Sequence, residues 1–434
     1  RAGASALIAG LALAAGKGQA LVIGSERRGA KPASIQEIVN GDAAAAILLG
    51  SGKPVARVLA VETLTVDFVD HFRANGQTHD YGWEERWVRE EGYLKLIPAT
   101  VAKLLRKTNV AAKDITRFLL PTPMNGAGAA VAKKLGVADT AIADPLIAGC
   151  GFSGAAHSLL MLVHALESAK PGDTILLAAF GNGCDAILLE VTPEIETAHA
   201  RRGVAGSLAR GMPNDDYLRF LSFHDEVGID WGMRAEFGNK YALTTEWLSS
   251  RDNLAFLGGR DRQTGVVQFP KTPKSVAPGA TGIAVYDDVP LADETAKVVS
   301  FTVDHLTYHP SPPLNFGLVQ FDNGARLLME FVDVAPGALV IGAPLRMVFR
   351  IKEIDHGRGY RHYFWKASPI AQQSPGAAEA DRNSATPGLL ALVPAASLSS
   401  PQRDTASAFD CQSCGACCSY SAEWPRFSTE DDAQ

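Results

Sequence analysis

The sequence has few cysteines before residue 400, no long apolar run and no excess of basic residues. Only Cys150 and Cys184 precede residue 400, and a disulfide-held secreted protein would spread its cysteines differently, so we expect a cytoplasmic protein. No apolar stretch reaches the length of a transmembrane helix, so we expect no membrane span. The 41 Lys and Arg against 47 Asp and Glu give a net charge of -6, which offers no electrostatic reason to expect nucleic acid as a partner.

The opening segment is apolar and rich in Ala and Gly. Residues 2–16 predict a helix, and residues 19–25 predict a strand. The core of a signal peptide is an alternative interpretation, because Arg1 is basic and the segment is apolar. The segment continues into the strand without the pattern of a cleavage site and linker, which favours the helix.

Strand-like and helical segments alternate up to about residue 192. Runs of apolar residues predict strands over residues 55–68, 118–120, 140–144 and 173–180. Apolar residues at helical spacing predict helices over residues 92–107, 128–135 and 153–169. The Gly-Asn-Gly turn at residues 181–183 predicts a hairpin with residues 186–191. This alternation is typical of a layered α/β domain.

Three stretches, residues 41–50, 83–93 and 133–136, resemble the hydroxymethylglutaryl-CoA synthases of the thiolase superfamily in their order and spacing. The resemblance covers about residues 1–192. It implies a thiolase-like layered αβαβα fold whose first part is missing from this sequence. It also implies an acyltransferase that takes acyl-CoA as substrate, forms a Cys thioester and then makes a carbon-carbon bond.

The same resemblance indicates where the reactive groups of such an enzyme would lie. In that family the nucleophilic Cys stands at the start of the helix that corresponds to residues 2–16, so we expect it directly before Arg1. The positive end of the helix dipole would favour its thiolate form. Gly181 and Gly183 match the glycine turn that supplies an oxyanion-binding N–H and are expected to bind substrate. A plain hairpin turn is the alternative for these glycines.

The sequence departs from the family pattern at two loops. The family His motif falls at residues 119–125, which contain no His; Thr122 and Asn125 remain as weak donors there, and Asn125 is a candidate substrate-binding residue. The loop that corresponds to the family Gly-Asn-Thr motif places Cys150 near the Asn position and His157 shortly after it. Both are candidate catalytic residues, and His157 is a candidate for acid-base chemistry. The alternatives are a small buried cysteine and a packed or capping histidine.

Residues 252–369 resemble a second family, acyl-CoA-associated OB-fold proteins in which a zinc ribbon precedes a small all-β barrel. The resemblance is carried by residues 265–270, 298–302 and 324–331. Alternating strands with Gly and Asp-Asn turns predict a barrel independently. The first cysteine pair of a zinc ribbon would fall at Asp261 and Thr264, so we predict a degenerate ribbon without zinc. Residues 193–251 are expected to form a helical connecting region.

The last part of the chain has a different composition. Residues 370–408 are rich in Ala, Ser, Pro and Gln and predict a disordered linker. Residues 409–434 hold a CxxC pair followed by adjacent cysteines, which is typical of soft-metal ligation and suggests zinc or iron. A disordered, oxidisable tail is the alternative. The four candidate metal ligands are Cys411, Cys414, Cys417 and Cys418.

Two main functions follow from these observations. The first is a condensing enzyme similar to hydroxymethylglutaryl-CoA synthase, with acyl-CoA as substrate and no cofactor in its main domain. The second is a non-catalytic relative that binds acyl-CoA or serves as a scaffold; the missing His and the altered loop at Cys150 favour it. A metal or redox function of the cysteine tail is a third. We expect a homodimer or a complex with another acyl-CoA enzyme.

Overall fold

The computed structural model describes residues 1–370 except 16–17, 198–202, 231–241, 336 and 356. Contacts divide the chain into Arg1–Ile370 and Ala371–Gln434. Nearly all of the predicted linker and the whole predicted cysteine cluster, with Cys411, Cys414, Cys417 and Cys418, therefore lie outside the described residues.

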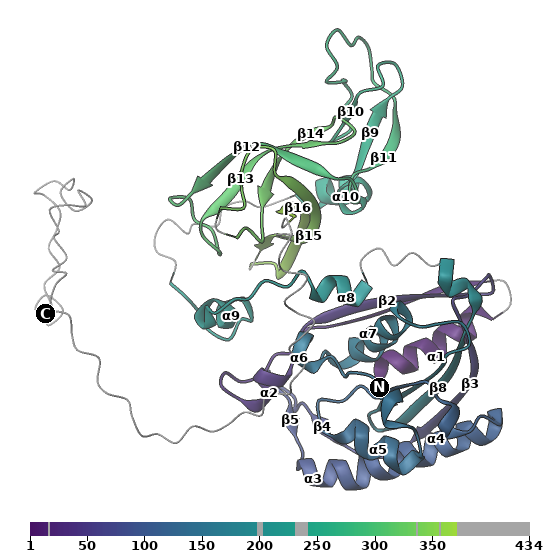
Figure 1. The fold of residues 1–434 in the computed structure, drawn as a ribbon. Coiled ribbons are helices and arrows are strands. Elements are labelled where there is room, and N and C mark those ends of the chain that lie inside the picture. Colours follow the sequence, from purple (N-terminus) through teal and green to yellow (C-terminus); the bar gives the residue numbers. More distant parts are fainter. Residues whose placement is uncertain (16–17, 198–202, 231–241, 336, 356, 371–434) are drawn as a thin grey trace, which may run out of the picture. The chain divides into compact units, whose positions relative to one another are not determined.

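The first half of the chain is layered (Figure 1). A two-stranded antiparallel sheet packs against two central helices, and the helices pack on a four-stranded sheet with strand order β3-β8-β7-β6. Two more helices cover the far face of that sheet. The strands are β1 (Gln19–Glu26), β2 (Ala43–Gly50), β3 (Ala56–Thr65), β6 (Arg117–Leu119), β7 (Thr174–Phe180) and β8 (Gly183–Val191). The central helices are α1 (Ala2–Ala14) and α7 (Gly154–Glu167), and the outer ones are α4 (Leu94–Thr108) and α5 (Ala127–Leu135).

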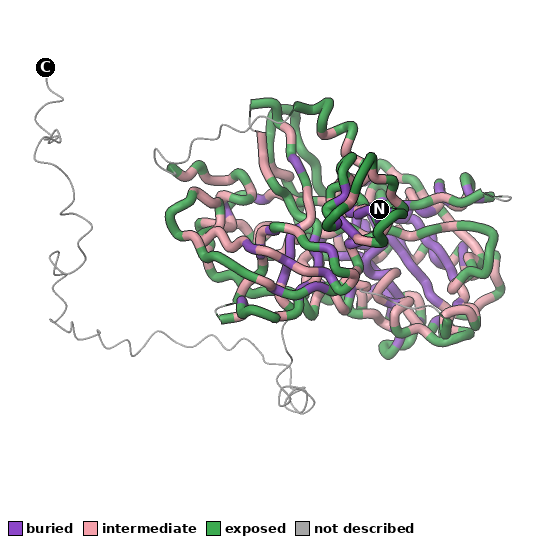
Figure 2. The backbone as a smooth tube through the Cα atoms, turned by 90° about the horizontal axis from the view of Figure 1, so that it is seen from above, coloured by how far each residue is buried: buried purple, intermediate pink, exposed green. Residues whose placement is uncertain are grey.

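Residues of β7 alternate between the two faces of the four-stranded sheet. Leu176 and Ala178 point into the core under α4 and α5. Ile175 and Leu177 point into the core under α1 and α7. Because side chains alternate along a strand, a strand buried on both faces must be apolar throughout, which explains the continuous apolar run in its sequence. Figure 2 shows several continuous stretches of buried backbone in purple.

The two-stranded sheet is apolar on both faces, but only one face is covered. Val22 packs in the core against the central helices. On the opposite face, Leu21, Ile23 and Leu48 are 61%, 62% and 63% exposed. This outward face of β1 and β2 is an exposed apolar surface.

Short elements connect the layers. They are α2 (Ile35–Val39), β4 (His71–Phe72), β5 (Tyr81–Gly82), α3 (Glu85–Trp87), a π-helical turn (Val88–Tyr93), α6 (Ile147–Cys150) and the 3-10 turns Ala112–Asp114, Asp139–Ala141 and Pro193–Thr197. The strand predicted over residues 140–144 is wrong, because a 3-10 turn precedes Ile142, which makes a single bridge to Phe118. An apolar run this short does not distinguish a strand from a buried turn.

The later part of the described chain begins with helices α8 (Gly203–Leu208), α9 (Tyr217–Phe223) and α10 (Leu243–Ala255). A three-stranded sheet follows, made of β9 (Leu257–Asp261), β10 (Val267–Gln268) and β11 (Tyr286–Pro290). Five further strands close into a barrel in the order β12-β13-β14-β16-β15. They are β12 (Ala296–Asp304), β13 (Leu314–Phe321), β14 (Arg326–Phe331), β15 (Pro344–Asp355) and β16 (Tyr360–Pro369).

The barrel has its own core around Phe256, Phe321 and Met329. Phe256 is fully buried and stacks on Trp365 of β16, with ring centroids 5.6 Å apart. A closed five-stranded barrel with a packed interior is the architecture of an OB fold. The predicted fold class, a layered α/β domain followed by a small all-β barrel, is confirmed.

Candidate functional site

Helix α1 begins against the turn between β7 and β8. The backbone nitrogen of Arg1 donates to the Phe180 carbonyl at 3.1 Å. A Cβ added at Gly181 would lie 3.0 Å from that nitrogen, and one added at Gly183 would lie 2.8 Å from Arg1 Nη1. Both glycines have φ in the left-handed region, at 148° and 113°. The turn therefore requires glycine both for its backbone and for its close approach to α1.

A buried carboxylate fixes the start of α1 on the sheet. Asp185 of β8 is only 1% exposed, accepts a hydrogen bond from the Ser5 hydroxyl and lies 3.7 Å from Arg1 Nε. Arg1 Nη1 also donates to the Leu64 carbonyl at 2.8 Å, at the end of β3. These bonds tie the first turn of α1 to the edge of the sheet at which β3 and β7 end.

Aromatic side chains pack beside this edge. Phe180 lies 4.4 Å from the Tyr93 ring and 5.7 Å from the Phe68 ring, measured between centroids. Tyr93 ends the π-helical turn, a distortion that often occurs at functional sites. Burial raises the pKa of Tyr93, and a hydrogen bond with the Thr122 side chain opposes that rise. The Tyr93 hydroxyl therefore stays protonated.

An apolar cavity of about 290 Å³ lies behind Thr122. Asn125 lines it together with Met124 and Pro145. Its walls come from β6, the start of α5 and the loop before α6, so they include the stretch in which the family His is missing. Asn125 and Gly181, both predicted to bind substrate, are connected only indirectly. Asn125 lines the cavity beside Thr122, which bonds to Tyr93. Tyr93 in turn packs on Phe180, the residue before Gly181.

Cys150 lies at the end of α6 and is half-buried. Its Sγ donates to the Leu146 carbonyl at 3.3 Å, and burial raises the pKa of the thiol. The protonated thiol is a weak nucleophile. A catalytic role for Cys150 stays a prediction, and its contacts are those of a structural cysteine.

His157 lies on the first turn of α7 and is fully buried. Nε2 lies 2.7 Å from the Pro145 carbonyl, and Nδ1 lies 3.3 Å from the Ser153 nitrogen, which donates to it. Burial lowers the pKa of this histidine, so it stays neutral. With both ring nitrogens engaged, His157 has the contacts of a packed histidine, and a catalytic role for it stays a prediction.

A second histidine follows β3 at the same edge of the sheet. His71 Nδ1 lies 3.1 Å from Asp70 Oδ1, and the His71 side chain is 47% exposed. The hydrogen bond to Asp70 raises the pKa of His71. Sequence reasoning missed this pair because the resemblance directed attention to the loops at residues 119–125 and 149–157. The adjacent Asp and His after a predicted strand were the signal that could have revealed it.

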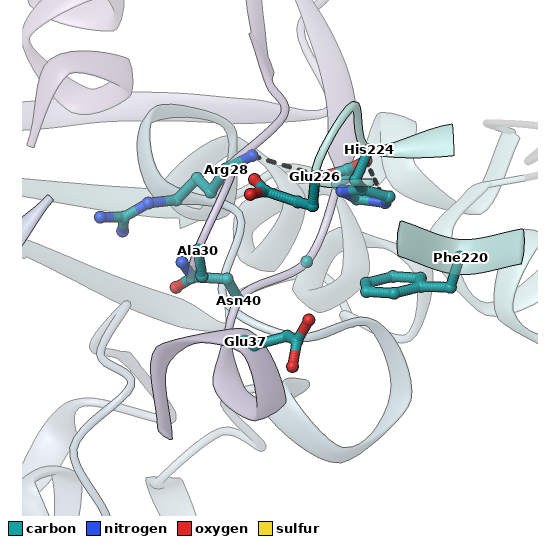
Figure 3. Close-up of a pocket in the computed structure, with 9 residues that line it drawn as sticks. Arg28, Ala30, Glu37, Asn40, Phe220, His224 and Glu226 are labelled. Atoms are coloured by element: carbon teal, nitrogen blue, oxygen red, sulfur yellow. Dashed lines mark hydrogen bonds and ion pairs between the residues drawn. The ribbon is translucent and has the colours of Figure 1, made fainter. Parts of the chain in front are cut away.

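A second, polar pocket of about 160 Å³ lies between the end of β1, α2 and the segment after α9 (Figure 3). The Arg28 backbone N–H donates to Asp42, and its guanidinium points away from the pocket in Figure 3 and pairs with Asp80 at 3.0 Å. Glu226 bonds His79 at 2.8 Å. Because its charged groups mostly pair within the protein, this pocket has the character of a contact between α9 and the layered domain.

The turn between β9 and β10 occupies the place of the first expected cysteine pair. Asp261 accepts hydrogen bonds from the Thr264 hydroxyl at 2.6 Å and from the Gln263 backbone N–H at 3.0 Å. Hydrogen bonds from Thr264, Gln263 and Ser275 lower the pKa of Asp261. Across the described ranges, no group of three His, Cys, Asp or Glu side chains has the geometry to hold a metal ion. Within the same ranges no helix is long and apolar enough to cross a membrane.

Two family models match parts of the chain. Residues 105–190 match the C-terminal domain of 3-oxoacyl-[acyl-carrier-protein] synthase III. Residues 288–350 match the C-terminal OB-fold domain of ChsH2. The chain combines a thiolase-like domain with an OB-fold domain. The sequence-based recognition of both is confirmed.

Individual proteins and solved structures are similar to parts of this chain. A hydroxymethylglutaryl-CoA synthase of Aeropyrum pernix is 32% identical over 229 residues, which are 52% of this chain and 60% of that protein. A crystal structure of HMG-CoA synthase complexed with CoA is 17% identical, with a TM-score of 0.38, over 52% of this chain and 61% of that one. An Ltp2–ChsH2(DUF35) aldolase structure is 19% identical, with a TM-score of 0.23, over 31% of this chain and 98% of that one. The chain thus spans about three fifths of the length of the Aeropyrum pernix protein.

Proposed function

We propose that the protein handles acyl-CoA by acyl transfer through a Cys thioester, followed by carbon-carbon condensation, as hydroxymethylglutaryl-CoA synthases do. The nucleophile of the proposal is a Cys directly before Arg1. The observation that carries it is the close approach of the Gly181–Gly183 turn to the first residue of α1. A side chain at the position before Arg1 would stand at the positive end of α1 and beside this turn.

The turn fits the stabilisation of an oxyanion. The Gly181 N–H donates to the Gly183 carbonyl at 3.0 Å, so it is used within the turn. The N–H that we assign to the oxyanion is therefore that of Gly183. A backbone donor held rigidly beside the nucleophile stabilises the tetrahedral intermediate without reorganisation.

The apolar cavity near Thr122 and Asn125 suits the uncharged part of an acyl-CoA. Its lining is mostly apolar, with two polar side chains to orient a thioester or an amide. This is the pattern of a pocket in which apolar area supplies affinity and a few polar groups supply orientation.

A non-catalytic acyl-CoA-binding protein is the second candidate. It is favoured by the absence of His from residues 119–125 and by the engaged nitrogens of His157. Such a protein would bind acyl-CoA in the same cavity and form no covalent adduct.

Intact mass measurement separates the two candidates. A protein extended upstream of Arg1 is mixed with acetyl-CoA, and peptide mapping locates any acyl adduct. An adduct directly before Arg1 that persists in the control variant Cys150→Ser supports the enzyme. Binding measured by calorimetry without an adduct supports the non-catalytic protein, and an adduct on Cys150 contradicts the assigned nucleophile.

The proposal includes a homodimer or a complex with another acyl-CoA enzyme. The exposed apolar face of Leu21, Ile23 and Leu48 supports association. Light scattering after size-exclusion chromatography measures the mass in solution. Zinc or iron at Cys411, Cys414, Cys417 and Cys418 stays a prediction for metal analysis, and a protein that ends at Pro369 is expected to keep its acyl-CoA binding.

A further inference from the structure

The proposed acyl transfer needs an acid-base group, and the loop at residues 119–125 provides none. When the nucleophile attacks the thioester, the carbon-sulfur bond to CoA breaks and the departing sulfur takes up a proton. His157 is a poor source of that proton because Pro145 and Ser153 engage both of its nitrogens. Another residue at the same edge of the sheet is therefore a candidate for this acid.

The segment after β3 lies at this edge. The Val66 N–H donates to the Asn182 carbonyl at 3.2 Å, which joins the segment to the Gly181–Gly183 turn. Two residues later, Phe68 packs on Phe180, whose carbonyl receives the hydrogen bond from Arg1. Asp70 and His71 therefore follow the end of β3 on the side of the sheet at which α1 begins.

Electrostatic effects agree with this placement. Burial raises the pKa of Tyr93, and Asp70 raises it further. Asp70 is thus within electrostatic reach of the Tyr93 hydroxyl, whose ring packs on Phe180 at the start of α1.

We propose that His71, held by Asp70 as a positioning residue, is the acid-base group that gives a proton to the departing CoA sulfur. This inference rests on the proposed acyl transfer. Because Nδ1 faces Asp70 at 3.1 Å, Nε2 is the nitrogen left to exchange the proton. The bond from the acyl carbon to the Cys sulfur forms, the bond to the CoA sulfur breaks, and Nε2 loses its proton to that sulfur.

The backbone around the pair is fixed. The Trp83 N–H donates to the Asp70 carbonyl at 2.9 Å, and His71 pairs with Gly82 across the short β4–β5 ribbon. The half-exposed imidazole can regain its proton from solvent. The charged groups that act on His71 are Asp70, Arg28 and Asp80; both acids raise its pKa and Arg28 lowers it.

The test measures CoA release from acetyl-CoA against pH, with the protein extended upstream of Arg1. His71→Gln is expected to lower the rate by about 100-fold, a typical contribution of general acid catalysis. Asp70→Asn is expected to move the alkaline limb of the profile to lower pH, because it removes the group that raises the pKa of His71. His164→Gln is the matched control, since His164 also pairs with a carboxylate, Glu167, at 3.2 Å.

The outcomes separate this inference from the proposed function. No adduct and no CoA release from the unaltered protein would overturn the acyl transfer itself. An active protein whose rate and pH profile are the same in His71→Gln would overturn only the role of His71. An unchanged profile in Asp70→Asn would overturn the pairing, even if His71→Gln were slow, because a merely structural defect lowers the rate without moving the profile.

Discussion

Two strand turns of this protein use opposite means to hold their shape. The β7–β8 turn depends on the absence of side chains, because side chains at Gly181 and Gly183 would meet Arg1. The β9–β10 turn depends on a side chain, because Asp261 accepts hydrogen bonds from residues of the same turn. A turn that keeps space open toward another element is suited to chemistry, whereas one that satisfies its own polar groups is suited to stability.

Gly183→Ala should give the largest effect and tests the first turn. A Cβ at Gly183 would lie inside contact distance of the Leu64 carbonyl oxygen and at 2.8 Å from Arg1 Nη1. We expect the free energy of unfolding to fall by at least about 3 kcal/mol, from steric clash and backbone strain together. Urea unfolding followed by fluorescence measures it.

Gly172→Ala is the matched control for this change. Gly172 has φ 86°, and a Cβ there would meet no atom within 4 Å. Only the strain of an alanine in the left-handed conformation should lower the free energy of unfolding, by about 1–2 kcal/mol. Equal losses at both positions would show that close approach to α1 and β3 contributes nothing, and the contrast between the two turns would fail.

His157→Gln tests whether the loop before α7 is structural or catalytic. Replacing the imidazole should lower the free energy of unfolding by about 1–2 kcal/mol at pH 7.5, because the buried Pro145 carbonyl and Ser153 N–H lose well-placed partners. Acyl transfer per folded molecule should be unchanged. A loss of activity without a loss of stability would restore His157 as a catalytic residue.

The pH dependence of the unaltered protein gives a second measure of His157. Burial holds its folded pKa below that of the unfolded chain, so protons bind the unfolded chain more tightly. Its contribution to stability is complete above about pH 6.5 and is lost as the pH falls toward the folded pKa. His157→Gln should flatten this part of the profile, as measured by urea midpoints between pH 5 and 7.5.

The sequence was sufficient to predict the layered domain and the barrel, because periodicity and turn residues determine both. β7 was predictable since burial on both faces requires an apolar run. The site was less predictable. Gly181 and Gly183 were identified through the family resemblance, but their approach to Arg1 joins residues about 180 positions apart, and no local pattern encodes it. The same holds for Asp185, whose partner Ser5 is equally distant in sequence.

Asp261→Asn tests the self-contained turn and should give the smallest effect. The change weakens the hydrogen bonds from Thr264 and Gln263 without altering the size of the side chain. We expect a lower urea midpoint for the OB-fold domain and no change in acyl-CoA binding. Asp287→Asn is the control, because its ion pair with Arg262 on the same sheet is exposed and should contribute less than about 0.5 kcal/mol.

The pH dependence decides whether the charge of Asp261 matters. Hydrogen bonds hold its folded pKa below the unfolded value, so its contribution to stability is present above the unfolded pKa of about 4 and is lost as the pH falls through the folded pKa. Asp261→Asn should remove this loss of stability at acidic pH. If the variant and the unaltered protein lose stability in parallel between pH 5 and 2.5, the turn does not depend on the carboxylate. Its shape would then come from the backbone alone, as at the β7–β8 turn.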